Sequence, residues 1–390
     1  MQRVGADVQA WLDDRAEAMA VLLEALMRVP TENPPGRELG RCAALLSDEL
    51  DRLGLAPELI ALPPTGRLEE PAIVRGTLGE GSELLYYHGH FDVVPAQHWS
   101  QFEPERRDGR IVGRGSADMK GGLVSMLYGA AAARELGLLG DRRIVLHLVC
   151  DEETGSTAGS GYLREAGLID PGAAAMLTAE PTGGVIWHAW RGAITLRVQV
   201  AGREAHVGYV HDGVNAFEHM IRVAEPLTRL SHNLLERRSM LVVGGQAGAG
   251  AGFNVVPGSA WFSVDRRFNP EEDLDDELAR LTGMINEEAE AVGAEVDIEV
   301  LQEQPSGSTD EQHPAAHALA RCVEAVEGAA EFQLCPGVLD TRWYAGLGIP
   351  AFGYGGGRLE VAHGPKEYIE EAAMRRCAAV YALFAAEVGR

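Results

Sequence analysis

The chain has 390 residues, of which 58 are acidic and 34 are basic, and its formal net charge is −24. Such an acidic surface repels phosphate backbones, so we expect no nucleic-acid partner. A hydrophobic content of 46% supports a full core in one large or two ordinary domains. The sequence has no apolar run near the roughly 18 residues of a membrane span, no signal-peptide pattern and no CxxC pair among its five cysteines. We therefore expect a cytoplasmic protein with reduced thiols and no membrane association.

The first part of the chain alternates between helical and strand patterns. Apolar spacing predicts helices over 14–29 and 37–53, and a third that starts after Lys120-Gly121-Gly122 and continues to Leu136. Strands are predicted over 73–77, 83–87, 144–149 and 173–178. The near-continuous apolar run 144–149 is typical of a strand that is buried on both faces. Alternating strands and helices indicate a largely parallel sheet, so the fold class is α/β.

The rhythm changes over residues 191–302. Strands are predicted over 194–200, 252–267 and 295–301, helices over 212–230 and 270–292, and a hairpin fits within 240–267. This order suits a small two-layer sandwich. The glycine-rich stretch 244–252 lacks the strand-then-helix frame of a nucleotide motif, and we predict a flexible loop there. Residues 303–390 return to helix, a strand over 351–354 and a C-terminal helix.

Polar residues follow three of the predicted strands. His90 and Asp92 follow the strand 83–87, the pair Glu152-Glu153 follows 144–149, and Glu180 follows 173–178. Open α/β sheets place their ligands at the carboxyl ends of strands. Two adjacent acids after an apolar strand are costly to bury unless metal or hydrogen bonds compensate, so Glu152-Glu153 is the sharpest local signal.

Two further residues complete a possible metal centre. Asp118 lies between glycine-rich turns, and His363 lies in an Ala-His-Gly-Pro segment. Alone, each would be read as an ordinary polar turn or surface residue. Together, two His and three carboxylates suit two divalent ions, with Zn²⁺ first and Co²⁺ or Mn²⁺ as alternatives. Glu152 is then left over as a general base, which gives the components of two-metal hydrolysis. A mononuclear enzyme stays open, because a ligand set does not report occupancy.

The motifs also occur in a specific order. They are His-x-Asp, Gly-Arg-Gly-x-x-Asp-x-Lys-Gly, Glu-Glu, Glu-Pro and Ala-His-x-Pro-x-Glu-Tyr. This order resembles the M20 metallopeptidase and amidohydrolase family, which includes acetylornithine deacetylase and succinyl-diaminopimelate desuccinylase, over essentially the whole chain. The resemblance implies His90, Asp118 and Glu180 on one metal, with Asp118, Glu153 and His363 on the other. It implies Glu152 as general base and acid, and we interpret Asp92 as the partner that fixes the His90 ring.

The resemblance also implies a role for the middle of the chain. It implies a discontinuous di-metal catalytic domain, residues 1–190 and 303–390, with an inserted two-layer α/β lid and dimerisation domain, residues 191–302. The segment 202–206 resembles the lid signature, whose His reaches the active site, often from the partner subunit. His206 is by that analogy a catalytic helper that steadies the oxyanion. Val210 departs from the Pro that the family usually has, which puts the local turn in doubt.

Substrate contacts are implied by the same resemblance. Asn254 and Arg267 are similar to lid residues that hold a substrate carboxylate, with Arg266 as an alternative. Arg342 and the Gly356 loop resemble segments near the substrate.

The resemblance also suggests which amide is cleaved. Deacylase members have Glu where this chain has Glu180, whereas peptidase members more often have Asp. We therefore expect a deacylase that removes the acyl group from an N-acyl amino acid, acting as a homodimer through the lid. A dipeptidase or carboxypeptidase is the alternative, and a catalytically silent metabolite-binding homologue is the third hypothesis.

Overall fold

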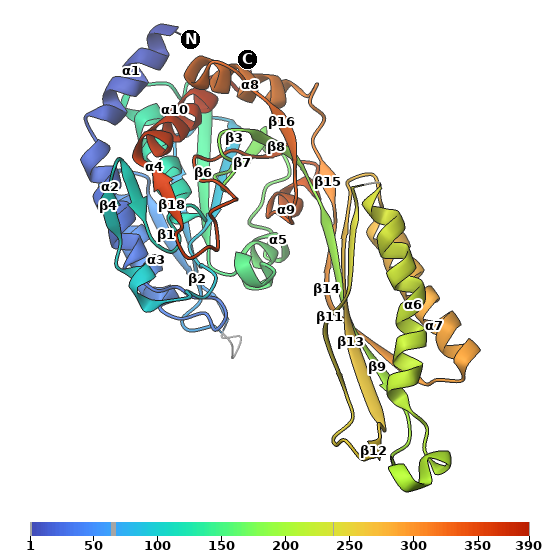
Figure 1. Cartoon of the computed structure of the whole chain (residues 1–390). Coiled ribbons are helices and arrows are strands. Elements are labelled where there is room, and N and C mark those ends of the chain that lie inside the picture. Colours follow the sequence, from blue (N-terminus) through green and yellow to red (C-terminus); the bar gives the residue numbers. More distant parts are fainter. Residues whose placement is uncertain (1, 64–67, 237, 390) are drawn as a thin grey trace. The chain divides into compact units, whose positions relative to one another are not determined.

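The computed structural model describes residues 2–63, 68–236 and 238–389, which divide into two compact units (Figure 1). The first unit comprises Met1–His188, Thr309–Leu334 and Asp340–Arg390, and the second comprises Ala189–Ser308 and Cys335–Leu339. The second unit therefore extends beyond 191–302 to residue 308 and adds the short segment 335–339. The functional division into a catalytic and a lid domain stays a prediction.

The main sheet has nine described strands in the order β1-β2-β6-β3-β7-β17-β8-β15, with β16 beside β8. Their bounds are β1 Pro57–Ala61, β2 Ala72–Leu78, β3 Glu83–His90, β6 Arg142–Val149, β7 Ala175–Thr178, β8 Ile186–Trp190, β15 Gly307–Ser308, β16 Phe332–Cys335 and β17 Ala351–Gly353. The four central strands β6, β3, β7 and β17 run parallel, while β1, β2, β8 and β15 pair antiparallel. The predicted α/β class with a mainly parallel central sheet is confirmed.

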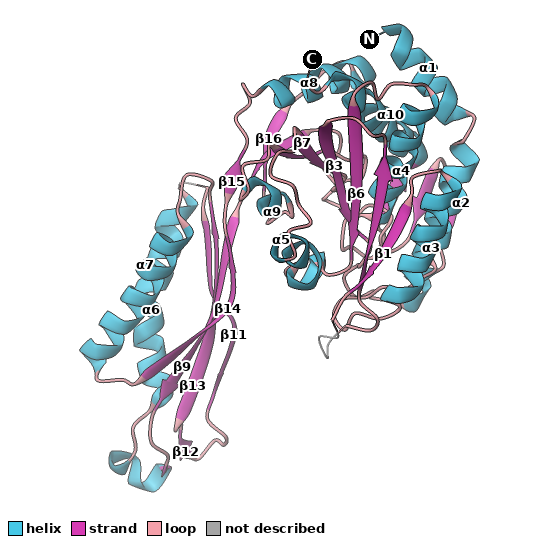
Figure 2. Cartoon of the chain, turned by 180° about the vertical axis from the view of Figure 1, so that it is seen from behind, coloured by secondary structure: helices cyan, strands magenta, loops and turns pink. Residues whose placement is uncertain are grey.

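Helices cover this sheet because their apolar faces need a partner. They are α1 Gln2–Asp13, α2 Ala16–Met27, α3 Leu39–Arg52, α4 Lys120–Glu135, α5 Tyr162–Glu165, α8 Pro314–Glu327, α9 Thr341–Ala345 and α10 Glu371–Glu387. Helices α4 and α10 pack against each other on one face of the central strands (Figures 1 and 2). Gly129 permits this close approach, because a β-carbon there would lie 2.6 Å from the carbonyl oxygen of Ala378.

The N-terminal region differs from the single helix predicted over 14–29. A separate helix, α1, precedes α2, and residues 14–15 form a turn between them. Val8 and Leu12 on α1 are fully buried in the main core, and the helix packs on α10 and α4. Tertiary packing therefore stabilises a helix that the local sequence pattern did not reveal.

The second unit is a two-layer sandwich. Its strands are β9 Gly192–Ala201, β11 Met240–Ala249, β13 Ser259–Phe268 and β14 Val296–Gln304, in the antiparallel order β11-β13-β9-β14. Helices α6 Ala216–Leu235 and α7 Leu274–Val292 lie side by side on one face of this sheet (Figure 2). Asp273 caps α7 by accepting hydrogen bonds from the N–H groups of Asp275 and Asp276. A small ladder joins β10 Ala205–His206 to β12 Val255–Val256.

The prediction of a flexible loop over residues 244–252 is wrong for most of that range. Residues 244–249 belong to β11, which pairs with β13 through backbone hydrogen bonds that need no side chain. The register shifts between Val243 and Ala247, and Gly244 there has a φ of +73°. Glycine adopts this conformation without steric cost, so the stretch forms a bulged strand.

The remaining described elements are short. They are β4 Glu105–Arg107, β5 Arg110–Val112 and β18 Tyr368–Glu370, which form a three-stranded sheet, and the turns η1 Trp99–Phe102, η2 Glu152–Thr154, η3 Thr157–Gly161 and η4 Val207–Asp212. Among the described helices, none is both long and apolar enough to cross a bilayer.

Candidate metal centre

The fold brings the predicted ligands to one edge of the main sheet. His90 is the last residue of β3, Glu152 and Glu153 open the turn after β6, and Glu180 lies two residues beyond β7. These strands are parallel neighbours, so their carboxyl ends meet. Asp118 lies just before α4, and His363 comes from the loop between β17 and β18.

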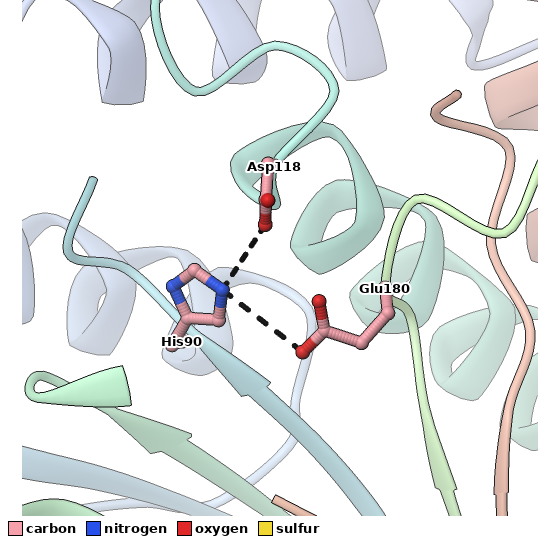
Figure 3. A group of neighbouring side chains, drawn as sticks. All are labelled: His90, Asp118 and Glu180. Atoms are coloured by element: carbon pink, nitrogen blue, oxygen red, sulfur yellow. Dashed lines mark ion pairs between the residues drawn. The ribbon is translucent and has the colours of Figure 1, made fainter. Parts of the chain in front are cut away.

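One group, which we call the inner group, consists of His90, Asp118 and Glu180. The His90 Nε2 atom lies 3.2 Å from Asp118 Oδ1 and 4.0 Å from Glu180 Oε1 (Figure 3). All three residues are buried. Within the described part of the chain, these same three atoms lack a hydrogen-bond partner. Buried polar atoms are almost always satisfied, so three orphans that converge on one point indicate a place for a cation.

A second group, the outer group, consists of Asp118, Glu153 and His363. The His363 Nε2 atom lies 3.1 Å from Asp118 Oδ2 and 3.4 Å from Glu153 Oε2. The His363 side chain is 49% exposed, in contrast to the ligand atoms of the inner group. Because Asp118 turns one oxygen towards each group, its carboxylate can bridge two ions.

Glu152 lies beside the inner group and belongs to neither group. Its Oε2 atom lies 4.0 Å from His90 Nε2. Burial, together with the negative charges of Glu180, Asp340 and Glu153, raises the pKa of Glu152 well above its ordinary value, although His90 opposes this. A carboxylate with a raised pKa beside a metal-type donor set is suited to take and return a proton.

Asp92 orients both sides of this arrangement. Its carboxylate accepts hydrogen bonds from the backbone N–H groups of Glu152, at 3.2 Å, and Glu153, at 3.1 Å. The His90 Nδ1 atom lies 3.0 Å from the Asp92 carbonyl oxygen. The Asp92 carboxylate also accepts a hydrogen bond from the side-chain amide of Asn33, at 2.9 Å. The Asn33 side chain is fully buried, which nothing in the run Asn-Pro-Pro indicates, so the sequence patterns do not single it out.

The electrostatics of the site favour cations. Burial raises the pKa of Glu180 to about 8. The Asp118 and Glu153 carboxylates raise the pKa of His363 to about 10. Burial lowers the pKa of His90, but the carboxylates around it outweigh that effect and hold its pKa well above normal. Crowded acids that hold protons in this way are relieved when a divalent ion binds, and the mixed nitrogen and oxygen donors suit Zn²⁺, Co²⁺ or Mn²⁺.

The predicted lid residues lie in the second unit. The His206 side chain is exposed, and its Nδ1 atom accepts a hydrogen bond from the Gly208 N–H. This contact uses Nδ1 as the acceptor and leaves Nε2 free of it. Asn254 is exposed, and its carbonyl oxygen accepts from the Val207 N–H.

The two adjacent arginines of β13 differ sharply. Arg266 is fully buried and pairs with Glu272 and Glu277 on the helix-covered side of the sheet. Arg267 is 31% exposed and forms a two-point pair with Asp265. Strand alternation places them on opposite faces, which favours Arg267 over Arg266 as a substrate contact.

The last two predicted contacts lie in the first unit. Arg342 is buried, and its guanidinium donates to Asp340 Oδ1 and to the Gly155 carbonyl oxygen. Gly356 packs against Ala373 of α10 and lines a cavity of about 240 Å³.

A comparison with known protein families agrees with the motifs described above. A sequence model described as peptidase family M20/M25/M40 matches residues 86–387. This range includes both ligand groups, Glu152 and the whole second unit.

Solved structures with the same fold extend over nearly the whole chain. A dipeptidase from Saccharomyces cerevisiae, at 16% identity and a TM-score of 0.80, covers 100% of each chain. Human carnosine dipeptidase 1 has 15% identity and a TM-score of 0.77, with 99% of this chain and 98% of that chain covered. A Bacillus subtilis protein described as a dinuclear metal-binding peptidase has 16% identity and a TM-score of 0.68, over 95% and 98% of the two chains. At these identities the likeness establishes the fold alone.

Proposed function

The chain belongs to the peptidase family M20/M25/M40, and on this premise we propose that it is a metal-dependent amide hydrolase that removes the acyl group from an N-acyl amino acid. The inner and outer groups would each hold one divalent cation, with Zn²⁺ as the first choice. The observation that carries this proposal is the convergence of three buried, unsatisfied atoms, His90 Nε2, Asp118 Oδ1 and Glu180 Oε1. The B. subtilis structure described as dinuclear supports a count of two.

The residues of the site divide the chemistry between them. When bound, the cations supply an acidified water and polarise the amide carbonyl. Glu152 takes a proton from the attacking water and returns it to the leaving amine, because its raised pKa suits both directions. Asp92 keeps Glu152 and Glu153 in register through their backbone N–H groups. His206 donates from Nε2 to the oxyanion.

The substrate carboxylate is assigned to Arg267 and Asn254. An arginine matches a carboxylate with two parallel hydrogen bonds, so Arg267 would exchange its pair with Asp265 for the substrate. Arg342 and Gly356 would contact the remainder of the amino acid. Glu180 supports a deacylase within this family.

Cleavage of a dipeptide is the second candidate. It is favoured by two structures described as dipeptidases, of which the chain covers 100% and 98%. Both reactions break an amide next to a free carboxylate, so the same residues would serve either substrate.

We also propose that the protein is a homodimer through the second unit. The order of its sheet leaves β11 as an edge strand, on which Val242 is 54% exposed. Ile221 and Phe217 on α6 are also exposed, at 50% and 43%. An edge strand beside exposed apolar side chains supports pairing with a second copy, and light scattering would measure the mass directly.

The test is a substrate panel with controlled metal. The full chain is stripped with a chelator, reloaded with Zn²⁺, Co²⁺ or Mn²⁺, and offered N-acetyl amino acids, N-succinyl amino acids and dipeptides. We expect turnover of the N-acyl compounds that returns with metal. Turnover of dipeptides alone would replace the first candidate with the second. Silence across the panel with two metals bound would contradict both.

A further inference from the structure

A buried ion pair lies behind the outer group without contributing a ligand. The Arg114 Nη1 atom donates to Glu367 Oε2 at 2.6 Å, and the two side chains are 1% and 0% exposed. Removing one partner of such a pair leaves the other as an uncompensated buried charge, so Arg114 and Glu367 depend on each other.

Glu367 uses its other oxygen to hold the shared ligand. Its Oε1 atom accepts hydrogen bonds from the backbone N–H groups of Ala117, at 2.9 Å, and Asp118, at 3.1 Å. The carboxylate therefore fixes the peptide from which the Asp118 side chain projects.

Arg114 uses its remaining terminal nitrogen to hold the outer histidine. The Nη2 atom donates to the carbonyl oxygens of His363, at 3.2 Å, and Pro95, at 3.3 Å. His363 needs this support, because its ring is half exposed and its backbone has a left-handed φ of +60°.

We propose that Arg114 and Glu367 are a positioning pair that keeps His363 and Asp118 at the separation required by the outer cation. The inference rests on the proposed function in one respect, that the outer group binds metal. The inner group is anchored differently, since His90 ends β3 and Glu180 follows β7. The pair supports two ligands of the outer group, Asp118 and His363, but only the shared Asp118 of the inner group, so it sets the affinity of the outer group more than that of the inner group.

The experiment compares Glu367→Gln and Arg114→Lys with a matched control, Glu83→Gln. Glu83 also pairs with a buried arginine, Arg142, at 3.0 Å, but both lie at the starts of β3 and β6, away from the carboxyl ends that carry the ligands. Stripped full-length proteins are titrated with Zn²⁺ by calorimetry, and His363→Ala identifies the outer binding event. Thermal unfolding is measured on each variant.

Removing a residue that supports a metal ligand typically weakens metal affinity about 10- to 100-fold. We expect that loss at the outer event in both variants, with the inner event within about threefold of wild type and both events unchanged in Glu83→Gln. In the His363→Ala background, Glu367→Gln should weaken the remaining binding event by less than about threefold.

The outcomes separate this inference from the proposed function. Two unchanged binding events in both folded variants would overturn the positioning role and leave the hydrolase proposal intact. Equal weakening of both events would overturn the preference for the outer group, and the same weakening in Glu83→Gln would show a general loss of structure and overturn the positioning role. Two metals in the wild type without turnover would remove the proposed reaction and leave the positioning role standing. A wild type that binds no metal would overturn both.

Discussion

The inner and outer groups share Asp118, yet they hold their other ligands in different ways. The inner ligands His90 and Glu180 come from the ends of neighbouring strands, and their side chains are 1% and 6% exposed. The outer ligand His363 comes from a loop and is 49% exposed. The two groups have similar donor atoms but differ in burial, so burial distinguishes the two sites more than residue type does. We therefore expect a tightly held inner cation and a more exchangeable outer one.

The largest effect is expected at Glu152. The test asks whether this residue transfers a proton without binding either cation. Glu152→Gln removes the proton acceptor but neither ligand set, so turnover should fall about 10²- to 10⁴-fold while metal content stays unchanged. Steady-state kinetics and metal analysis would measure the two quantities on the same sample. Glu58→Gln, at a carboxylate with 59% side-chain exposure on β1, serves as the control. A near-normal kcat in Glu152→Gln would rule out the proton-transfer role.

The next effect separates the two histidines. In stripped protein near pH 7, His90→Ala removes the buried positive partner of the Asp118 carboxylate, which costs roughly 3–5 kcal/mol. His363→Ala acts on a half-exposed residue and should cost about 1 kcal/mol or less. Denaturant unfolding would give both free energies, and metal analysis should show the loss of one ion in each variant. Equal destabilisation would contradict the contrast in burial.

The protons released when a cation binds provide a third comparison of the two groups. The raised pKa values of His363, about 10, and Glu180, about 8, mean that both groups carry protons at pH 7 in the stripped protein. A cation must displace these protons, so metal affinity should rise with pH between 6 and 8, by up to about tenfold per unit for each proton released. Calorimetry in buffers of different ionisation enthalpy counts the protons. His363→Ala should release fewer protons than wild type, and a pH-independent affinity would contradict the assignment.

The sequence revealed the sheet and the strand-end ligands because both follow from local patterns. The apolar run of β6 and the acids after it are visible in the chain, and so is the alternation that separates Arg266 from Arg267 once β13 is known. The hairpin expected within 240–267 is present as β11 and β13, but helix α1 and the strand character of residues 244–249 were missed, since tertiary packing and backbone pairing form them.

The supporting residues of the site could not be predicted for a different reason. Asn33 lies in a loop and Gln101 in the short element η1, and both side chains bond to segments far away in the chain. Arg114 and Glu367 occur within the quoted motifs, but only the fold shows that they meet. A motif records which residues occur together, whereas a hydrogen bond across 253 positions requires the three-dimensional path of the chain.

The smallest expected effect concerns Gln101, one of these supporting residues. The Gln101 side-chain amide donates to the Gly364 carbonyl oxygen at 3.0 Å, beside His363 and on the outer side only. The same side chain also accepts hydrogen bonds from the backbone N–H groups of Gln97 and His98, but only its bond to Gly364 reaches the His363 loop. One hydrogen bond contributes about 1 kcal/mol, so Gln101→Ala should weaken the outer cation about fivefold and leave the inner one unchanged. Zn²⁺ titration measures both events, with Gln9→Ala as a control, because Gln9 bonds Asp13 within α1. If Gln101→Ala weakened the two events equally, the loop would support the whole centre, and the independence of the inner group would be wrong.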